Sequence, residues 1–585
     1  MSDLAYIEAF KARDDLDIYG DNALLLFALE MRFEVEDIHS VAEQALTDGV
    51  DDKKCDLVYV DRDNSYALVA QGYYSRGTRS SAPANKASDL NTAVSWLLTM
   101  DLHELPETIR SAARELRDAI ESGDINILEF WYNHNLPEST NVENELKAVE
   151  RTAQNAIRTY YKDSNCSEIR SIEVGTNTLQ TWYKALRNPI LVDQDFEIII
   201  PGGYALKSEN WRAYQTAVPA TWFYEVYNNF GEDIFSANPR GYLGSRRSDA
   251  NINNGIKRSA KESPDNFWAF NNGITALVNK FRIIGKSTKR IKIEGLSIVN
   301  GAQTTGAIGS LAKSPNSDAM VPTRFIECSN PKIVQQIIEF NNSQNKMVPA
   351  DFRSGDPIQK RLREEFRKYP TPIVYSGGRR GGTEDIIRRN PNLLPSDTIA
   401  QALAAFHGKP RDAYNSKSQL WRSERLYNDI FNDHITAEHI IFVYSLQQVI
   451  SKTKRNLMSK SRNNELLTED EQTILSFLRM RGALFLLVAA LGDCIETILD
   501  QPVPSKFSLH FKNKIPLNSC EKNWLYIIDS MFAFSDVLRP PLENSLRSNE
   551  EVLTAIAEFK MRVRATRKPL KEVYENFGKN ITVRN

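Results

Sequence analysis

The chain has 585 residues, and at roughly 150 residues per domain this length predicts two to four domains. Its 73 Lys and Arg residues nearly balance its 75 Asp and Glu residues, so the overall charge indicates neither a nucleic-acid partner nor a membrane partner. The five cysteines form no CxxC pair and have no metal-ligand spacing, which excludes a cysteine-based metal site and indicates reduced thiols.

The amino-terminal segment, MSDLAYIEAFKARDDLDIYG, is acidic and polar, whereas a secretory signal needs a basic start and an apolar core. No run of about 18 apolar residues follows it anywhere in the sequence. We therefore expect a cytoplasmic protein with no membrane partner.

The predicted elements begin with helical structure over 20–46, where apolar residues recur at helical spacing. Two short strands follow at 55–60 and 66–74, joined by a polar turn. Helical patterns over 88–100 and 106–123 then precede an aromatic strand at 125–134. These elements predict an α/β unit near the amino terminus.

The rest of the chain divides by composition, and the predicted fold class is a multidomain α/β protein with mixed α and β elements. Polar loops rich in Asn, Gly and Arg alternate with compact apolar runs in the middle of the chain, and the last third is mainly helical. The predicted regions are 1–105, an α/β unit; 106–234, a mixed α/β connecting region; 235–394, a motif-rich core; and 395–585, a helical region.

The stretch TILSFLRMRGALFLLVAALGDCIETIL in the helical region is long and apolar. Acidic residues flank it, and Arg479 and Arg481 interrupt it. These charges indicate a buried core helix rather than a membrane span.

A strand-turn-helix pattern stands out at residues 293–311, IEGLSIVNGAQTTGAIGSL. Asn300 and Gly301 suit the tight turn, because glycine tolerates a positive φ, and the small residues that follow allow a closely packed helix. The amino terminus of such a helix favours an anion, and Gln303, Thr304 and Thr305 add side-chain donors. The alternative is a structural turn whose Asn and Thr residues cap the helix.

Two further amide-rich clusters occur near this pattern. FNNGIT contains Asn271 and Asn272, and FNNSQNKMV contains Asn341, Asn342 and Gln344. Each cluster follows an apolar element, and three such clusters exceed what helix capping usually needs. They predict a shared polar binding site.

These motifs, in this order, resemble the AIPR family of abortive infection phage resistance proteins. The resemblance rests on FSANPRGYLG (235–244), the segment 251–256, AFNNGIT, IVNGAQTT, IIEFNNSQNKMV and IVYSGGRRGG, and it is strong over about 220–385. It implies a role in bacterial defence against phage.

The central pattern also looks like the DGQHR and FxxIN motifs of ParB-like domains, which bind nucleotides or DNA. Asn300 stands where that motif has an acid, and Thr304 stands where it has an arginine. A metal-holding carboxylate and a phosphate-binding cation are therefore missing, so the likeness implies binding better than hydrolysis. Arg379 and Arg380, in SGGRRGG, are candidates for phosphate contacts, and a solvated loop is the alternative.

The amino-terminal unit resembles a PD-(D/E)xK nuclease module, as in many AIPR proteins. The likeness assigns Glu30, Asp56 and Gln71 as ligands of Mg²⁺, the only cofactor suggested. Tyr73 stands where the module has lysine, and a phenol is uncharged at neutral pH. The alternatives are an inactive module, a replacement base such as Lys53 or Lys54, or an ordinary pair of strands.

Two basic runs, at 452–462 and 560–571, lack intervening acids. They suit phosphate contacts, although solvated helix faces are the more common explanation of such runs.

We therefore interpret the sequence as a bacterial defence protein that binds nucleic acid or a nucleotide, with absent or impaired nuclease activity. The rival hypothesis is a non-catalytic sensor or scaffold that recruits a separate effector of a multi-gene defence system. The sequence leaves open whether other defence proteins bind the chain and whether it forms a homo-oligomer.

Overall fold

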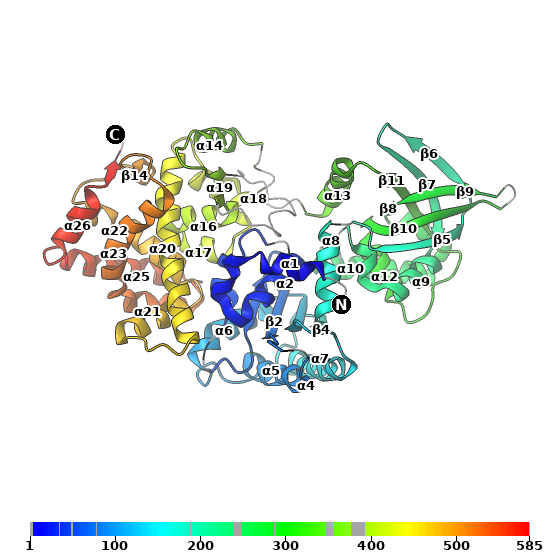
Figure 1. The fold of residues 1–585 in the computed structure, drawn as a ribbon, viewed down its shortest axis with the longest axis horizontal. Coiled ribbons are helices and arrows are strands. Elements are labelled where there is room, and N and C mark those ends of the chain that lie inside the picture. The colour runs from blue at the N-terminus through cyan, green and yellow to red at the C-terminus, as the bar shows by residue number, and fades with distance from the viewer. Residues whose placement is uncertain are drawn as a thin grey trace.

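The computed structural model describes residues 4–583 except 34, 48, 50, 78, 188, 238–246, 286–287, 347–349, 351–352, 354 and 376–391. Figure 1 shows three parts: an amino-terminal α/β unit, a central sheet with helices that projects to one side, and a helical carboxy-terminal region. The predicted fold class, mixed α/β with a helical carboxy-terminal region, is confirmed.

The amino-terminal unit is built on a four-stranded sheet with the order β1-β2-β3-β4. Its strands are β1 (Leu57–Asp61), β2 (Tyr66–Tyr73), β3 (Ile127–His134) and β4 (Glu168–Val174). The first pair is antiparallel, as the predicted turn requires, and the other two pairs are parallel. The sheet thus includes strands from both sides of the predicted boundary between residues 105 and 106.

Helices cover both faces of this sheet. They are α1 (Ala5–Lys11), α2 (Ala23–Phe33), α3 (Ile38–Ala45), α4 (Ala84–Ser88), α5 (Leu90–Leu98), α6 (Glu107–Glu121), α7 (Thr140–Tyr160) and α8 (Thr176–Arg187). Along β2, Leu68 and Ala70 pack with the cluster that contains α2, whereas Ala67 and Val69 pack with the cluster that contains α5, α6 and α7. This alternation buries both faces.

The central part is a seven-stranded sheet with the order β5-β10-β8-β11-β7-β6, in which β9 also pairs with β10. The strands are β5 (Val192–Ile199), β6 (Gly203–Lys207), β7 (Trp211–Pro219), β8 (Ile274–Val278), β9 (Lys280–Ile284), β10 (Arg290–Asn300) and β11 (Met320–Cys328). The associated helices are α9 (Ala220–Phe230), α10 (Arg247–Glu262), α11 (Phe267–Phe270), α12 (Ala302–Gly309) and α13 (Pro331–Lys346).

The two faces of the central sheet carry different helices. Phe223 of α9 and Ile308 of α12 join the larger apolar cluster, together with Ile256 of α10. Val334 and Ile337 of α13 pack against a smaller cluster on other side chains of the sheet. Because α13 covers its face with few apolar residues, part of that face is left to polar side chains.

The carboxy-terminal region consists mainly of helices around one large core. The helices are α14 (Pro357–Arg367), α16 (Ser396–Phe406), α17 (Pro410–Asn415), α18 (Gln419–Arg422), α19 (Glu424–Ile430), α20 (Ala437–Arg462), α21 (Glu469–Arg479), α22 (Ala483–Leu499), α23 (Leu517–Phe532), α24 (Arg539–Glu543), α25 (Asn549–Ala565) and α26 (Lys571–Gly578). Short strands pair as β12 (Val374–Tyr375) with β13 (Leu393–Leu394), and as β14 (Leu509–Phe511) with β15 (Ile581–Val583).

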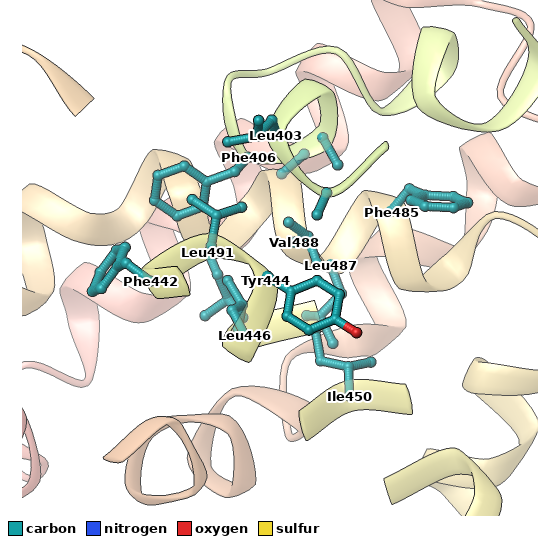
Figure 2. Close-up of a cluster of buried hydrophobic side chains, with 14 of the residues drawn as sticks. Leu403, Phe406, Phe442, Tyr444, Leu446, Ile450, Phe485, Leu487, Val488 and Leu491 are labelled. Atoms are coloured by element: carbon teal, nitrogen blue, oxygen red, sulfur yellow. The ribbon is translucent and has the colours of Figure 1, made fainter. Parts of the chain in front are cut away.

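Side chains from α16, α20 and α22 meet in the middle of this core. Figure 2 shows Phe406, Phe442 and Leu491 close together, and all three are fully buried. The predicted continuous apolar helix is wrong in one respect, because the chain breaks between α21 and α22 at Gly482, whose φ is +87°. Within the described chain, no single helix is long and apolar enough to cross a membrane, and α21 and α22 pass that test only as a pair bent by 104°.

The basic residues of α20 join the helical region to the amino-terminal unit. Lys454 donates a hydrogen bond to the backbone oxygen of Glu43 at 2.5 Å, and Nε of Arg455 lies 3.6 Å from a carboxylate oxygen of the same residue. Arg481 also reaches across, to the carboxylate of Glu115 and to the backbone oxygen of Val58. The basic run at 452–462 therefore contributes to an internal interface.

The second basic run, at 560–571, is also engaged in structural ion pairs. Lys560 lies 2.9 Å from Asp493, and Arg562 lies 2.8 Å from Asp536. These pairs tie α25 to neighbouring elements, so neither run is a free row of cations.

The helices α12 and α9 approach closely at Gly309, so we expect a larger side chain there to destabilise the protein. A Cβ atom on Gly309 would overlap the ring of Tyr227. We expect Gly309→Ala to destabilise the protein by about 1–3 kcal/mol, because overpacking forces side chains or backbone to shift. Thermal unfolding followed by circular dichroism measures this. Gly255→Ala is the control, because a Cβ there meets open space, and a similar loss in both variants would contradict the packing argument.

A buried pair of histidines should make the stability of the protein depend on pH. Nε2 of His407 lies 3.0 Å from Nε2 of His439, and burial lowers the pKa of His439 from 6.5 to about 4. Between pH 6.5 and pH 4 His439 is protonated in the unfolded chain but not in the folded chain. The free energy of unfolding is therefore highest above pH 6.5 and decreases as the pH falls toward 4. The loss approaches about 3 kcal/mol.

The measurement is the thermal midpoint of the wild type and of His439→Gln between pH 7 and pH 4.5. The midpoint of the wild type should fall more steeply on acidification. His434→Gln, at an exposed position, should retain the steep fall. Parallel curves for the wild type and His439→Gln would refute the assignment.

Candidate functional site

The strand-turn-helix pattern predicted at 293–311 is confirmed as β10, Gly301 and α12. Gly301 has φ +95°, and a Cβ there would lie 2.7 Å from a side-chain carbon of Ile274 on β8. The N-cap position of α12 is Gly301, which has no side chain with which to cap the helix. The close contact instead fixes the end of β10 against the start of β8.

Polar side chains from three adjacent strands meet at this end of the sheet. Asn300 of β10 is in register with Thr275 of β8, and Thr275 is in register with Arg324 of β11. Nη2 of Arg324 donates to Oγ1 of Thr275 at 3.0 Å. Because partners in register share a face of the sheet, these three side chains project on the same side.

Asn341 of α13 completes this group, which we call the polar cluster: Thr275, Asn300, Arg324 and Asn341. Nδ2 of Asn300 donates to the backbone oxygen of Asn341 at 3.0 Å, and Arg324 donates to Oδ1 of Asn341 at 2.7 Å. Arg324 is exposed, whereas Thr275 is 7% exposed. The guanidinium is thus fixed in direction while its outer side meets solvent.

The structure joins two of the predicted amide clusters and adds a residue that the sequence motifs missed. Asn300 and Asn341 lie 41 positions apart in the chain and are hydrogen-bonded in space. Arg324 belongs to no motif. The signal that marks it is a lone arginine in an otherwise largely apolar strand, MVPTRFIEC, directly after the motif.

The third amide cluster lies beside α10. Nδ2 of Asn271 donates to Oγ of Ser259 and to the backbone oxygen of Phe267, both at 3.0 Å. Asn272 is exposed in the turn that leads to β8. Asn271 therefore lies near the same end of the sheet as the polar cluster, but it is hydrogen-bonded to α10.

The remaining central residues are placed less favourably for a ligand or are not described. Thr304 is 4% exposed inside α12, and Gln303 is half-buried in the first turn of that helix. Asn342 and Gln344 lie in α13, with side chains outside the described part of the structure. Arg379 and Arg380 fall within 376–391, outside the described residues.

In the amino-terminal unit, Asp56 contacts the backbone of β2 on either side of Gln71. Oδ2 of Asp56 accepts a hydrogen bond from the backbone N–H of Gly72 at 2.7 Å, and the N–H of Asp56 donates to Ala70 at 2.9 Å. Gln71 is 5% exposed, and its Oε1 accepts no hydrogen bond from the described residues. Gln71 therefore keeps one buried acceptor open, whereas the carboxylate of Asp56 lies on the side of Gly72, where a Cβ would come within 3.8 Å of its Oδ2.

Glu30 is placed differently. It is 2% exposed on α2, and its carboxylate forms an ion pair with Arg13. The helix α2 packs on one face of the sheet, whereas alternation along β2 directs Gln71 and Tyr73 to the other face. The carboxylate of Glu30 is thus balanced by a guanidinium on the α2 side.

The replacement bases considered from the sequence are also engaged. Nζ of Lys53 lies 2.6 Å from Asp51 and over the ring of Trp96, and Nζ of Lys54 lies 3.9 Å from Asp89. Neither contact directs an ammonium to Asp56.

The predicted Mg²⁺ donor set does not fit this arrangement. The described residues include no group of three or more His, Cys, Asp or Glu side chains placed to hold a metal ion. Glu30 is neutralised by Arg13, and Glu30 and Gln71 lie on opposite sides of the sheet. We therefore derive no metal-dependent step from these residues.

A cavity of about 230 Å³ lies where the amino-terminal unit meets the helical region. Several of its polar lining groups bind one another: Ser418 donates to Asp63, Thr398 donates to Asp37, and Lys417 lies 2.9 Å from Asp397. These bonds identify it as part of the internal interface.

A comparison with protein families decides the affiliation of the chain. The family model described as AIPR protein matches residues 235–535, which is more than half of the sequence. The chain belongs to the AIPR family. Membership indicates a role in abortive infection, an antiviral defence against phage. No curated protein and no solved structure matches the chain.

The match covers the polar cluster, Asn271 and α10. It begins after β5, β6 and β7 and leaves out the amino-terminal unit. The likenesses to PD-(D/E)xK nucleases and ParB-like domains stay predictions.

The hydrogen bond from Asn300 to Asn341 should stabilise α13 locally. We expect Asn300→Ala to raise amide exchange in α13 about fivefold, because it removes a hydrogen bond of about 1 kcal/mol between β10 and α13. Hydrogen-exchange mass spectrometry measures this. Asn228→Ala is the control, since it removes a 2.7 Å bond within α9 and a 3.5 Å bond to Gly309, neither of which involves α13. Unchanged exchange in α13 of Asn300→Ala would refute the tethering role.

Proposed function

We propose that this AIPR protein acts in phage defence by binding nucleic acid or a nucleotide at the polar cluster. The observation that supports this most directly is Arg324, which is exposed and yet hydrogen-bonded to both Thr275 and Asn341. A guanidinium whose direction is already fixed loses less conformational freedom when it binds a phosphate. Its remaining N–H groups suit phosphate oxygens.

The amides around Arg324 suit the same class of ligand. Asparagine offers both a donor and an acceptor, which match the edges of nucleobases. Asn300 and Asn341 are half-buried, so they are held in place and remain reachable. A cation beside fixed amides fits a phosphate joined to a base better than a simple inorganic anion.

Cleavage is not part of the main proposal. Tyr73 stands in place of the lysine, and Glu30 is paired with Arg13. We propose that the amino-terminal module is inactive or impaired as a nuclease. Incubation of the protein with labelled DNA and RNA in Mg²⁺ tests this, and cutting that Asp56→Ala abolishes would contradict it.

A second function, recruitment of a separate effector protein, is favoured by one observation. Tyr204 and Leu206, both on the edge strand β6, are each about 60% exposed. Exposed apolar side chains near one another at an edge of a sheet suit a protein partner. This surface is distant in sequence from the polar cluster, so the two roles are separable by mutation.

The proposed function makes a prediction about Arg324. We expect Arg324→Ala to weaken binding of DNA or RNA and to reduce the slope of log affinity against log salt by about 1, because one phosphate contact is lost. Fluorescence anisotropy at several salt concentrations measures both quantities. Plaque counts in cells that carry the complete defence system test the biological role.

Arg282→Ala is the matched control. Arg282 is exposed on β9 of the same sheet and lies 3.7 Å from Glu294. It should retain wild-type affinity, salt slope and protection against phage. Equal affinity of Arg324→Ala and the wild type would contradict the proposal.

A further inference from the structure

A hollow of about 430 Å³ lies beside the third amide cluster. The last two turns of α10, including Arg258 and Glu262, form one side, and Phe270 and Asn271 at the end of α11 form another. We call this the α10–α11 hollow. It combines a cation, a carboxylate, an aromatic ring and an amide.

Phe270 presents an aromatic surface to this hollow. Its side chain is 65% exposed, and its ring stacks on no other aromatic ring of the described residues. Exposure of a phenylalanine forfeits the free energy of its burial, which is about 1.5–3 kcal/mol. A stacked base would recover part of this, since base–aromatic stacking is worth about 1–3 kcal/mol.

Asn271 presents a hydrogen-bond acceptor. Both N–H groups of its amide are used, one by Ser259 and one by the backbone oxygen of Phe267. These bonds fix the plane of the amide. Oδ1 accepts no hydrogen bond from the described part of the chain, so it is open to a donor such as the exocyclic amino group of a base.

Arg258 and Glu262 determine how much negative charge the hollow accepts. They lie one turn apart on α10, both are exposed, and no ion pair or hydrogen bond with a described residue occupies either side chain. One guanidinium suits one phosphate, whereas the nearby carboxylate repels additional ones. One positive charge beside one negative charge favours a single phosphodiester over a nucleoside triphosphate.

The hollow and the polar cluster lie at the same end of the central sheet. Asn271 precedes Thr275 by four residues, so their α-carbons are at most about 14 Å apart. The chain passes from the hollow directly into β8, which carries Thr275. Because α10 packs on one face of the central sheet and α13 on the other, a strand that contacts both Arg324 and Phe270 passes around this end of the sheet.

We propose that the α10–α11 hollow is a nucleobase subsite that takes one unpaired base of a single-stranded nucleic acid. Phe270 stacks on the base, Asn271 accepts its amino hydrogen, and Arg258 contacts the adjacent phosphate. A base within a duplex cannot offer its face to Phe270. This inference rests on the proposed function, and it adds that the substrate is single-stranded.

The test is fluorescence anisotropy with four labelled probes and the full-length protein. The probes are a mixed-sequence single-stranded DNA, the corresponding RNA, the same DNA with abasic sites throughout, and the duplex. AMP and ATP serve as unlabelled competitors. We expect the wild type to bind the single strands more tightly than the abasic strand and the duplex.

Variants of the hollow identify the source of this preference. Phe270→Ala should weaken single-strand binding about 5- to 150-fold, toward the affinity for the abasic strand, and Phe270→Tyr should restore it. Asn271→Ala should shift the preference among bases, because it removes the acceptor Oδ1. Trp268→Ala is the control, because this residue is 56% exposed on the same short helix but does not line the hollow.

The outcomes separate this inference from the proposed function. Equal binding of normal, abasic and duplex probes would overturn the base subsite and leave nucleic-acid binding standing. Binding of no strand would overturn nucleic-acid binding. If AMP bound but no strand did, and Phe270→Ala abolished AMP binding, recognition of a base in the hollow would be upheld with a free nucleotide as the ligand. If Phe270→Ala bound all probes like the wild type, the subsite would be overturned.

Discussion

The arrangement at the end of the central sheet depends on the close passage of the backbone at Gly301. Because no side chain fits between this residue and Ile274, β10 can end directly against the start of β8. That contact places Asn300 beside Thr275, and the strand order then brings Arg324 next to both. A single left-handed residue thus fixes side chains that come from three strands and, through Asn341, from a helix.

Much of the local structure could be predicted from the sequence, since it depends on short patterns. The turn at Gly301, the first strand pair and the aromatic strand β3 follow from spacing and from residue type. The contacts between distant segments could not be predicted. Arg13 neutralises Glu30, and Arg324 orients Asn341, and neither arginine lies in a recognisable motif. Pairings of this kind depend on the tertiary fold, which a single sequence does not reveal.

The distribution of cations shows why charge density was a poor guide to the site. The two conspicuous basic runs form structural ion pairs, and Lys454 is buried against the amino-terminal unit. The two cations proposed to contact a ligand, Arg258 and Arg324, lie outside these runs and face solvent. A buried cation stabilises an interface when it is paired, whereas a ligand site needs a cation that is held and still accessible.

The strand order also bears on how this protein divides into functional pieces. The AIPR match begins at residue 235, yet β10 and β11 within it pair with β5 and β7 outside it. A fragment cut at that point would present two unpaired strand edges, the kind of surface that promotes aggregation. The matched stretch is therefore shorter than the central sheet. The residues before it, from β5 onward, supply the strands that cover the edges of β10 and β11.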